Sequence, residues 1–507
     1  MALSSTPQSS PKTSRWFTAA LVAVISLLAL ILRFHMLGTR SLWVDEGVSV
    51  AIARFSWLDF FGILWRREGN MSLYYLLLRG WLHLGDSETA IRALSAITSS
   101  GAVITIFFLG KKLFDRYTGA VAALLLALNV FHIRYAQEAR SYAVLSLAVI
   151  LATWCFVSAV ESSSQNKWVL YAVISAAAVY LHFFAVLVVA AHVLSALLWK
   201  RPVPWRNLAV STALFGILVL PVGAFLRANS NNHQLDWVKF PTGPEFYDFL
   251  LFFTGQGGVV MLCLCSIIAA AVVGLLILES RKQNNSAGTF RLGLIVLWLF
   301  LPPAILLAVS TVKPLFVGRY MAISVPALAL VLARGTTMFP PRWRVVLAAL
   351  LFAFCAYGVR SYYATGFQSA EDWRSAAALY SNQVRDGDVI MFNNGLTRAV
   401  FEYYAMADTH SPLRNVVFPF HGNRMSIMDF EGLPNPVLVR YRTKAIDRAW
   451  TVDWVLSSSA GLLLDKSFHQ SMSQQFQNVT VSLYVRDRVE PIPISIAPGS
   501  PAPAIQH

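Results

Sequence analysis

Long apolar stretches separated by short polar segments run through the first 360 residues of the chain. The first stretch, residues 16–38, is long enough to cross a membrane, because a helix of about 20 apolar residues spans the hydrocarbon core. The same pattern recurs at 88–110, 118–133, 141–160, 168–182, 184–199, 207–226, 258–278, 292–311, 318–334 and 345–361. The pattern therefore predicts about eleven transmembrane helices, all within a domain of residues 16–361.

The segment between the first two stretches, residues 39–85, has a mixed pattern. Trp57, Phe60, Phe61, Leu64 and Trp65 recur at helical spacing, next to charged residues. Aromatic residues on one face of a charged helix are typical of helices that lie in the membrane interface. We therefore expect interfacial helices in 39–85. The apolar stretch at 71–84 is expected to be interfacial or re-entrant rather than spanning.

After about residue 362 the pattern changes to shorter, alternating elements. Helical periodicity is predicted at 371–384, 396–406 and 459–475, and strands are predicted at 388–392, 437–441, 450–457 and 479–485. Alternation of strands and helices indicates a small α/β domain over residues 362–487. The two ends, residues 1–15 and 488–507, are rich in Ser, Pro and Ala, and are predicted to be disordered.

Composition supports a membrane protein. The 507 residues are 56% hydrophobic and only 13% charged, whereas a soluble protein carries roughly 25% charged residues. The net charge of +15 does not indicate nucleic acid, because the basic residues gather in short loops, as membrane topology requires. Cys155, Cys263, Cys265 and Cys355 all lie in apolar stretches, so we interpret them as core residues rather than disulfides or a metal cluster.

Loop charges predict the orientation. Basic residues such as Lys112, Lys167, Arg281 and Arg334 fall in alternate loops, on the same side as Lys12. By the positive-inside rule this side is cytoplasmic. The first loop also contains arginines, but long loops count for less. The first loop and the domain after residue 362 are therefore predicted to be extracytoplasmic.

Two adjacent acids, Asp45 and Glu46, follow the first predicted span. Unpaired carboxylates are costly at the edge of a membrane, so a functional role competes with a simpler one, the capping of a juxtamembrane helix. Neighbouring residues on a helix point about 100° apart. One acid can therefore face a reaction centre while the other holds backbone or a basic partner.

A second polar cluster, containing Gln137, Glu138, Arg140 and Tyr142, lies in the next external loop. It is either a solvated turn with a weak local ion pair or the wall of a polar pocket. So many polar groups in a short loop favour the pocket wall.

Two further candidates lie where predicted spans reach the same face. His182, beside two phenylalanines, is either structural or part of the pocket. Arg319, beside Tyr320, either extends to lipid headgroups or binds a phosphate with both arms of its guanidinium group. Acids, an amide and guanidinium groups on one face suit a reaction with a base for a hydroxyl acceptor and cations for a departing phosphate.

Several motifs together resemble a known class of enzymes. They are SLWVDEGVS at 41–49, LYYLLL at 73–78, GDSETAIRALS at 85–95, HIRYAQEARSYA at 132–143, GRY at 318–320 and EDWR at 371–374. Over about residues 16–487 the chain resembles the GT-C fold glycosyltransferases that use polyprenyl-phosphate sugars. Within them it is similar to glycosyltransferase family 39, with its protein mannosyltransferases, and to the bacterial aminoarabinose transferases.

The resemblance implies transfer of a sugar, with inversion, from a polyprenyl-phosphate donor to a lipid, glycan or protein acceptor. Asp45 matches the catalytic acid position and would be the general base, with Glu46 as a supporting second acid. Arg140, Arg319 and Tyr320 would contact the donor phosphate or position the acids. Gln137 and Glu138 match the second-loop motif of the family. Together with Tyr142 and His182, which were singled out above by their positions, they make up the predicted pocket. The resemblance also implies a multi-pass protein of a bacterial inner membrane.

The chain departs from its relatives in one segment, where Gly69–Ser72 replaces a frequently proline-rich sequence, which leaves the geometry on the acceptor side open. No metal ligands are assigned, although two acids and an amide could bind Mg²⁺ or Mn²⁺. The sequence has no glycine-rich nucleotide motif of the GxxxxGK[ST] or GxGxxG type, as expected for a lipid-linked donor.

Two other functions remain as alternatives. A transporter or flippase for lipid-linked sugars would carry ionisable residues in the middle of its spans and inverted repeats. A sugar-sensing or scaffold protein would leave the polar residues at the membrane face without a role. The charges lie mainly at the ends of spans and no internal repeat is found, so the sequence favours the enzyme. It specifies neither the sugar nor the acceptor.

Overall fold

The computed structural model describes residues 11–487, except 163, 200–204, 231–235, 283–285, 366–368, 410–412, 414, 420–424, 432–435 and 455–458. Residues 1–10 and 488–507, both within the predicted disordered ends, lie outside the described part. The chain forms two compact units. The membrane unit comprises Met1–Trp373 with Met425–Ile427, and the sheet unit comprises Arg374–Arg424 with Met428–His507.

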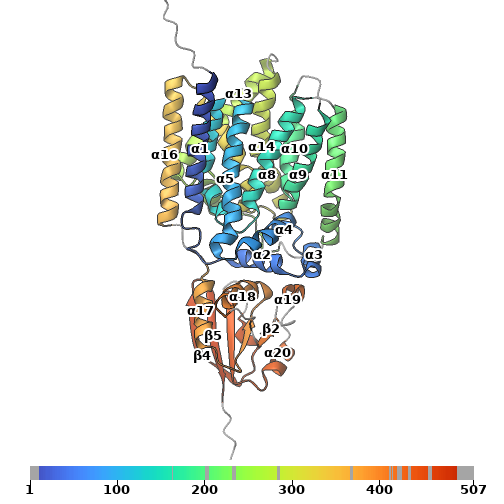
Figure 1. Ribbon diagram of the computed structural model, residues 1–507, viewed down its shortest axis with the longest axis vertical. Helices are drawn as coiled ribbons and strands as arrows, with labels where there is room; N and C mark the ends of the chain where they lie inside the picture. The colour runs from blue at the N-terminus through green and yellow to red at the C-terminus, as the bar shows by residue number, and fades with distance from the viewer. Residues whose placement is uncertain are drawn as a thin grey trace, which may run out of the picture. The chain divides into compact units, whose positions relative to one another are not determined.

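Long apolar helices make up most of the membrane unit (Figure 1). Seven are long and apolar enough to cross a membrane among the described residues: α1 (Pro11–Phe34), α5 (Glu88–Leu113), α8 (Tyr142–Val160), α11 (Trp205–Ala228), α13 (Gly258–Lys282), α14 (Ser286–Ser310) and α16 (Pro341–Ala364). An eighth span results if α6 (Arg116–Leu128) and α7 (Val130–Ala136), which are bent by 61°, are counted as one. The predicted class, a helical polytopic membrane protein with a small α/β domain, is confirmed.

The predicted number of spans, about eleven, is too high by this measure. The stretches at 168–182, 184–199 and 318–334 do form helices, namely α9 (Gln165–Leu181), α10 (Ala185–Ala196) and α15 (Val325–Thr336). A helix of 12 residues, such as α10 or α15, is about 18 Å long, whereas the hydrocarbon core is about 30 Å thick. These helices end early because the chain breaks at His182 and because α15 is preceded by a 3₁₀ helix, η3 (Gly318–Ile323).

The bend between α6 and α7 has identifiable partners. The Asn129 side chain accepts a hydrogen bond from the His132 amide (2.9 Å) and donates one to the Phe253 carbonyl (3.0 Å). Arg33 of α1 donates to the carbonyls of Leu126 and Ala127, at 3.3 and 3.2 Å. Carbonyl groups at a helix end have no partner within the helix, so this buried arginine stabilises the bend that leads into the polar loop 135–142.

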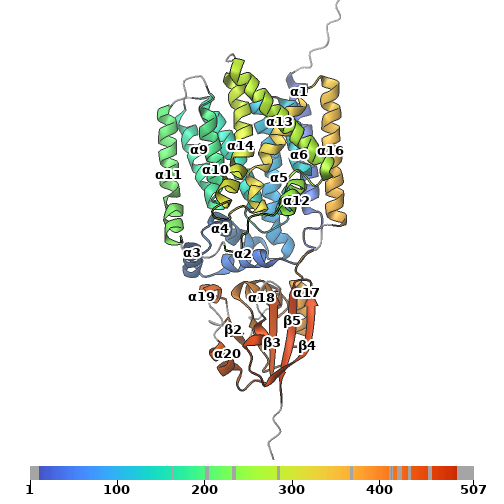
Figure 2. The same cartoon turned by 180° about the vertical axis from the view of Figure 1, so that it is seen from behind.

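The first loop forms short helices, as predicted. They are α2 (Val44–Arg54), α3 (Trp57–Arg66), α4 (Ser72–Trp81) and η1 (Leu82–Leu84). Ser56 caps α3 by accepting a hydrogen bond from the Asp59 amide, and Trp57, Phe61 and Trp65 of α3 are exposed. Figure 2 shows α2, α3 and α4 together at one end of the membrane unit. The later loop at 227–257 contains a further helix, α12 (Gly243–Phe253), while its residues 231–235 lie outside the described part.

The sheet unit is built around one mixed sheet with the strand order β2-β1-β3-β5-β4. Its strands are β1 (Val389–Phe392), β2 (Val416–Phe418), β3 (Arg448–Trp454), β4 (Phe468–Phe476) and β5 (Val479–Arg486). β1 pairs in parallel with β2 and β3, and β5 pairs antiparallel with β3 and β4. Helices α17 (Trp373–Gln383), α18 (Gly395–Thr409), α19 (Ile427–Glu431) and α20 (Pro436–Thr443) and the turn η4 (Ala460–Leu463) complete the elements after residue 372.

Two elements of this domain were predicted wrongly. The predicted strand at 437–441 lies in helix α20, where Pro436 occupies the first position, which suits proline. The predicted helix at 459–475 is instead η4 followed by strand β4. β4 lies at the edge of the sheet and is mostly exposed, so it lacks the alternation of apolar and polar residues by which a half-buried strand is recognised.

Candidate active site

Asp45 lies in the first turn of α2 and remains accessible, with 26% of its side chain exposed. Its Oδ2 forms ion pairs with Arg140 Nη2 and Arg319 Nη1, each at 3.5 Å. Arg140 Nη1 also donates to the Asp45 carbonyl and to Ser49 Oγ, both at 3.3 Å. Burial alone would lower the pKa of Arg140, but the adjacent Asp45 carboxylate raises it well above its ordinary value. The site therefore contains an accessible carboxylate between two cations.

Glu46 points in a different direction and is fully buried. Its carboxylate accepts two hydrogen bonds from Arg92 of α5, at 2.8 and 2.7 Å, and one each from the Ala139 amide (2.8 Å) and the Trp43 amide (3.2 Å). Burial tends to raise the pKa of Glu46, but Arg92 holds it below its ordinary value. Of the two acids, Glu46 thus holds backbone and a basic partner, and Asp45 faces the accessible side.

The residues of the second loop also separate into two roles. Gln137 is fully buried and donates to the carbonyls of Arg33 (3.2 Å) and His35 (2.9 Å), so it connects this loop to the end of α1. Glu138 pairs through Oε1 with Arg134 Nε at 2.7 Å. Its Oε2 is buried and has no hydrogen-bond partner among the described residues. Gln137 is therefore structural, whereas Glu138 has one unused acceptor.

The structure brings the remaining predicted residues to the same place. The Arg319 guanidinium carbon lies 5.6 Å from the Trp43 ring and 5.4 Å from the Trp237 ring. The His182 ring packs against Tyr320 at 4.7 Å and lies 6.2 Å from Tyr142. His182 accepts a hydrogen bond from the Phe184 amide through Nδ1. His182 therefore packs beside Tyr320, the residue that follows Arg319.

A polar cavity of about 460 Å³ adjoins Arg319. It is lined by two arginines, one acid, one amide and four aromatic residues: Arg134, Arg319, Glu138, Gln256, Trp43, Tyr135, Phe252 and Tyr362. Guanidinium groups suit phosphate because they can donate two parallel hydrogen bonds. The cavity can therefore accept an anionic group next to Asp45.

The second carboxylate near Asp45 is Glu68, which the motifs did not identify. It follows α3, and Tyr75 Oη donates to its Oε2 at 2.9 Å. Burial raises the pKa of Glu68 and Asp45 raises it further, while Arg140 and the Tyr75 hydrogen bond oppose the change. Its only sequence signal was an acid placed just before the Gly69–Tyr75 segment.

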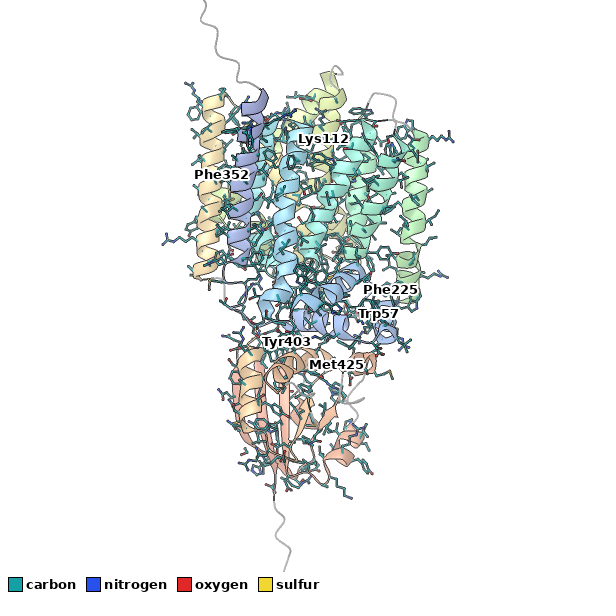
Figure 3. The ribbon with its side chains drawn as sticks, viewed as in Figure 1. Trp57, Lys112, Phe225, Phe352, Tyr403 and Met425 are labelled. Carbon is teal, nitrogen blue, oxygen red and sulfur yellow. The ribbon has the colours of Figure 1, made fainter. Side chains whose placement is uncertain are left out.

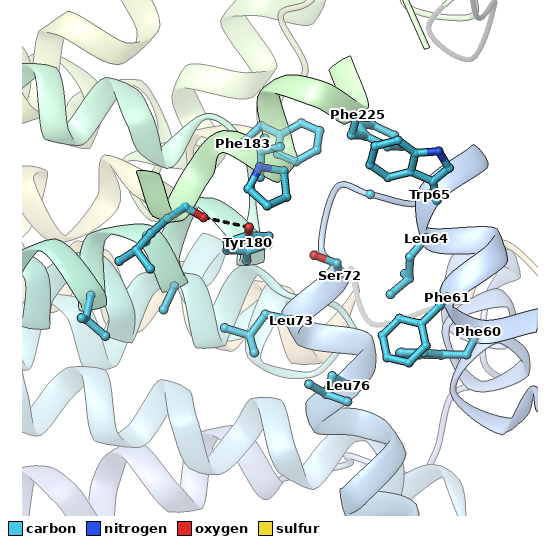
Figure 4. Close-up of a pocket in the computed structure, with 17 residues that line it drawn as sticks. Phe60, Phe61, Leu64, Trp65, Ser72, Leu73, Leu76, Tyr180, Phe183 and Phe225 are labelled. Carbon is cyan, nitrogen blue, oxygen red and sulfur yellow. Dashed lines mark hydrogen bonds between the residues drawn. The ribbon is translucent and has the colours of Figure 1, made fainter. Parts of the chain in front are cut away.

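An apolar cavity of about 650 Å³ is lined in part by Gly69, the residue that follows Glu68 in the sequence. Its lining comes from α3, α4, α9 and α11 and from loop residues such as Gly69, and it includes Ala177 of α9. Leu64, Leu73 and Phe225 are among the lining residues labelled in Figure 4. A Cβ atom on Gly69 would lie 2.7 Å from the Phe225 ring, so glycine permits the close approach of α11 here. The apolar cavity thus includes the residue that follows Glu68, and the polar cavity includes Arg319, the ion-pair partner of Asp45.

Among the described residues, no three His, Cys, Asp or Glu side chains are grouped as metal ligands. Asp45 is instead paired with two guanidinium groups. The residues present at this site therefore do not form a ligand set for the Mg²⁺ or Mn²⁺ ion that the sequence left open.

Comparison with known proteins finds a family match over part of the chain. Residues 72–225 match the model of the family described as dolichyl-phosphate-mannose-protein mannosyltransferase. No match was found among curated protein sequences.

Solved structures resemble nearly the whole chain. ArnT from Cupriavidus metallidurans in the apo state has a TM-score of 0.63 at 12% identity, covering 93% of this chain and 98% of ArnT. The same protein bound to undecaprenyl phosphate gives 0.63 at 12%, covering 91% and 97%. AglB, an oligosaccharyltransferase from Archaeoglobus fulgidus, in complex with an inhibitory peptide and a dolichol-phosphate, gives 0.52 at 11%, covering 95% and 75%. The chain has the GT-C fold, and the resemblance predicted from the sequence is confirmed.

Proposed function

We propose that the chain is an inverting glycosyltransferase that moves a sugar from a polyprenyl-phosphate donor to a hydroxyl of a lipid, glycan or protein acceptor. One observation carries the proposal: Asp45 is the accessible acid, and it lies between Arg140 and Arg319. The GT-C fold and the match to the mannosyltransferase family model support it. Two of the similar structures, ArnT and AglB, are in complex with undecaprenyl phosphate and with a dolichol-phosphate, respectively.

In this mechanism, the Asp45 carboxylate takes the proton of the acceptor hydroxyl while the hydroxyl oxygen attacks the anomeric carbon. The bond from that carbon to the phosphate oxygen breaks, and its electron pair leaves with the polyprenyl phosphate. Arg140 and Arg319 stabilise the charge that develops on the phosphate. Their contacts to Asp45, at 3.5 Å, are longer than the roughly 2.7–2.9 Å of a strong charged hydrogen bond, so the arginines can turn towards a phosphate.

The two cavities suit the two ends of such a donor. The polar cavity would hold the phosphate and sugar, and the apolar cavity beside Gly69 would hold part of the prenyl chain. Glu68 would be a second acid near Asp45, whose charge raises the pKa of Glu68 beyond the effect of burial. Lys112 and Trp57 of α3 lie toward opposite ends of the membrane unit (Figure 3). Because the positive-inside rule puts the basic Lys112 end in the cytoplasm, the reaction would take place at the other end, on the extracytoplasmic face.

Buried charge within the spans gives little support to a transporter. Arg33 and His132 are buried and hydrogen-bonded at 2.9 Å. However, Arg33 also binds the carbonyls released at the bend between α6 and α7, which explains its position without a transport pathway.

The test is sugar transfer in membranes that contain wild-type or Asp45→Asn protein, supplied with radiolabelled polyprenyl-phosphate sugars. A general base contributes about 10²–10⁴-fold to rate, so Asp45→Asn should lose at least about 100-fold. Asp59→Asn, an acid on the neighbouring helix α3, serves as the control and should retain full activity. Transport of labelled lipid without transfer, equal in wild type and Asp45→Asn, would support the transporter instead.

A further inference from the structure

A short segment after the last spanning helix returns to the loop that carries Asp45. The carboxylate of Glu371 accepts hydrogen bonds from the Val44 amide (2.8 Å) and from Trp373 Nε1 (2.7 Å). The Trp373 amide donates to Ser41 Oγ at 3.1 Å. Glu371 is 5% exposed and Trp373 is fully buried. All four residues belong to the membrane unit, so the EDWR motif does more than mark the start of the next domain.

The contact with Val44 acts at the start of helix α2. The first amides of a helix have no partner within it and carry the positive end of the helix dipole. The residue before α2 is Trp43, whose side chain does not cap the helix. Glu46 binds the Trp43 amide, and Glu371 binds the Val44 amide. The residue that follows these two amides is Asp45.

We propose that Glu371 and Trp373 are positioning residues for Asp45: they fix the first turn of α2 so that the Asp45 carboxylate faces the Arg140–Arg319 pair. This inference rests on the proposed function, and it assigns no contact with substrate. Glu371 lines neither cavity and acts through α2 alone. Trp373 also ends the continuous stretch Met1–Trp373 of the membrane unit. The contacts of Glu371 and Trp373 with residues 41–44, here called the clamp, therefore lie where the chain first leaves that unit.

Electrostatics support the close relation between these groups. Burial raises the pKa of Glu371, and the charges of Asp45 and Glu46 raise it further, while the hydrogen bonds from Trp373 and Val44 lower it. A glutamine at position 371 would keep an oxygen that accepts the hydrogen bond from the Val44 amide. It would also remove a negative charge that burial and the neighbouring acids disfavour. Glu371→Gln is therefore the conservative variant, and Glu371→Leu is the disruptive one.

The chain offers a matched control for Trp373. Trp450 of β3 is also fully buried, and its Nε1 donates to Asp388 Oδ2 at 2.8 Å. Both residues belong to the sheet unit. Trp373→Phe and Trp450→Phe each remove one indole N–H from a buried carboxylate, but only the first removes it from the clamp on α2.

The experiment uses the full chain in lipid nanodiscs and measures two quantities. The first is kcat and KM for a radiolabelled polyprenyl-phosphate sugar. The second is hydrogen–deuterium exchange in the peptide that covers residues 42–48. We expect Glu371→Leu and Trp373→Phe to lower kcat by roughly 10- to 100-fold, because small displacements of a catalytic group are that costly. The donor KM should stay within about twofold, and exchange should accelerate.

Glu371→Gln should restore kcat and exchange to near the wild-type values, and Trp450→Phe should change neither. Unchanged kcat in Glu371→Leu and Trp373→Phe, or a loss that Glu371→Gln does not rescue, would overturn the inference. If Asp45→Asn keeps full activity, the proposed function fails instead. In that case unchanged exchange in Glu371→Leu would independently refute the clamp. Should Glu371→Leu not fold, Trp373→Phe and Glu371→Gln give the same test.

Discussion

Two neighbouring acids show how strongly one step around a helix changes the role of a carboxylate. Asp45 is 26% exposed and meets its arginines at 3.5 Å. Glu46 is fully buried and is bound by both arms of Arg92. A buried carboxylate is tolerated only when it is paired and hydrogen-bonded. The accessible acid can exchange its partners during a reaction, whereas the buried acid cannot do so without cost.

Replacing Glu46 should therefore affect stability more than chemistry. Glu46→Ala removes the carboxylate that balances the charge of buried Arg92, and breaking a buried ion pair costs about 3–5 kcal/mol. Asp45→Asn should change the free energy of unfolding by less than about 1 kcal/mol. Denaturation in detergent, followed by circular dichroism, measures both. A fully stable Glu46→Ala protein with no activity would contradict this assignment.

The ion pair between Glu46 and Arg92 should also stabilise the protein in a defined pH range. The folded-state pKa of Glu46 lies below the ordinary value of 4.5, so the unfolded state binds the proton more readily. The contribution of Glu46 to stability is therefore fully present above pH 4.5 and is lost as the pH falls through the folded-state pKa. This loss should be absent in the Glu46→Ala protein, which provides an internal control.

Arg319 should act on the phosphate of the donor. Arg319→Ala removes a cation that borders both Asp45 and the polar cavity, and the loss of such a group costs about 100-fold in kcat/KM. Lys313→Ala, an exposed lysine on the segment that precedes η3, is the control and should behave as wild type. Steady-state kinetics with a labelled polyprenyl-phosphate sugar measure the difference. Equal kcat/KM for the two variants would remove Arg319 from the site.

At the scale of elements, apolar stretches predicted where helices form, but not where they end. α9 and α10 are separated at His182, and α15 follows η3, because local breaks shorten stretches whose composition alone suggests full spans. The edge strand β4 was mistaken for a helix because its exposed position leaves no apolar alternation. Local sequence carries periodicity, but the ends of elements depend on contacts made by distant residues.

The site follows the same rule. Asp45, Arg140 and Arg319 were predicted to meet, because topology brings the ends of their spans to one face, and in the structure they do so. The roles of Gln137 and Glu46 as buried anchors depend on partners far away in the chain, His35 and Arg92. Glu68 was not identified as a neighbour of Asp45, because a single acid outside a motif carries no periodic signal. Glu371 lies in the EDWR motif, but its contact with the Val44 amide joins residues 327 positions apart, which local sequence does not reveal.

The apolar cavity gives a prediction about four elements together. Ala177 of α9 lines the cavity, whereas Val169 of the same helix is 38% exposed and does not. Ala177→Phe fills part of the space proposed for the prenyl chain, and Val169→Phe is the matched control. Loss of about two buried methylene groups of the donor, at about 0.8 kcal/mol each, lowers kcat/KM about tenfold. A short-chain donor that does not reach the cavity should be unaffected by Ala177→Phe.

At the scale of the whole molecule, the two ends of the membrane unit differ in charge and in chemistry. Lys112 lies toward one end and Trp57 of α3 toward the other (Figure 3). α5 connects these ends with 26 residues, or about 39 Å of helix, which is enough to cross the bilayer. The orientation of the protein can therefore be tested on α5 alone, by labelling one exposed residue near each of its ends.

His83, just before α5, and Lys111, in its last turn, are both exposed, and cysteines at these positions test the orientation. A membrane-impermeant maleimide added to spheroplasts with an intact inner membrane should label His83→Cys and leave Lys111→Cys unlabelled. Both should react once the cells are permeabilised, which shows that each thiol is accessible. The positive-inside rule requires this pattern, because the Lys111 end carries the basic loops. The reverse pattern would place Asp45 in the cytoplasm, where nucleotide sugars are present, and would remove the reason for a lipid-linked donor.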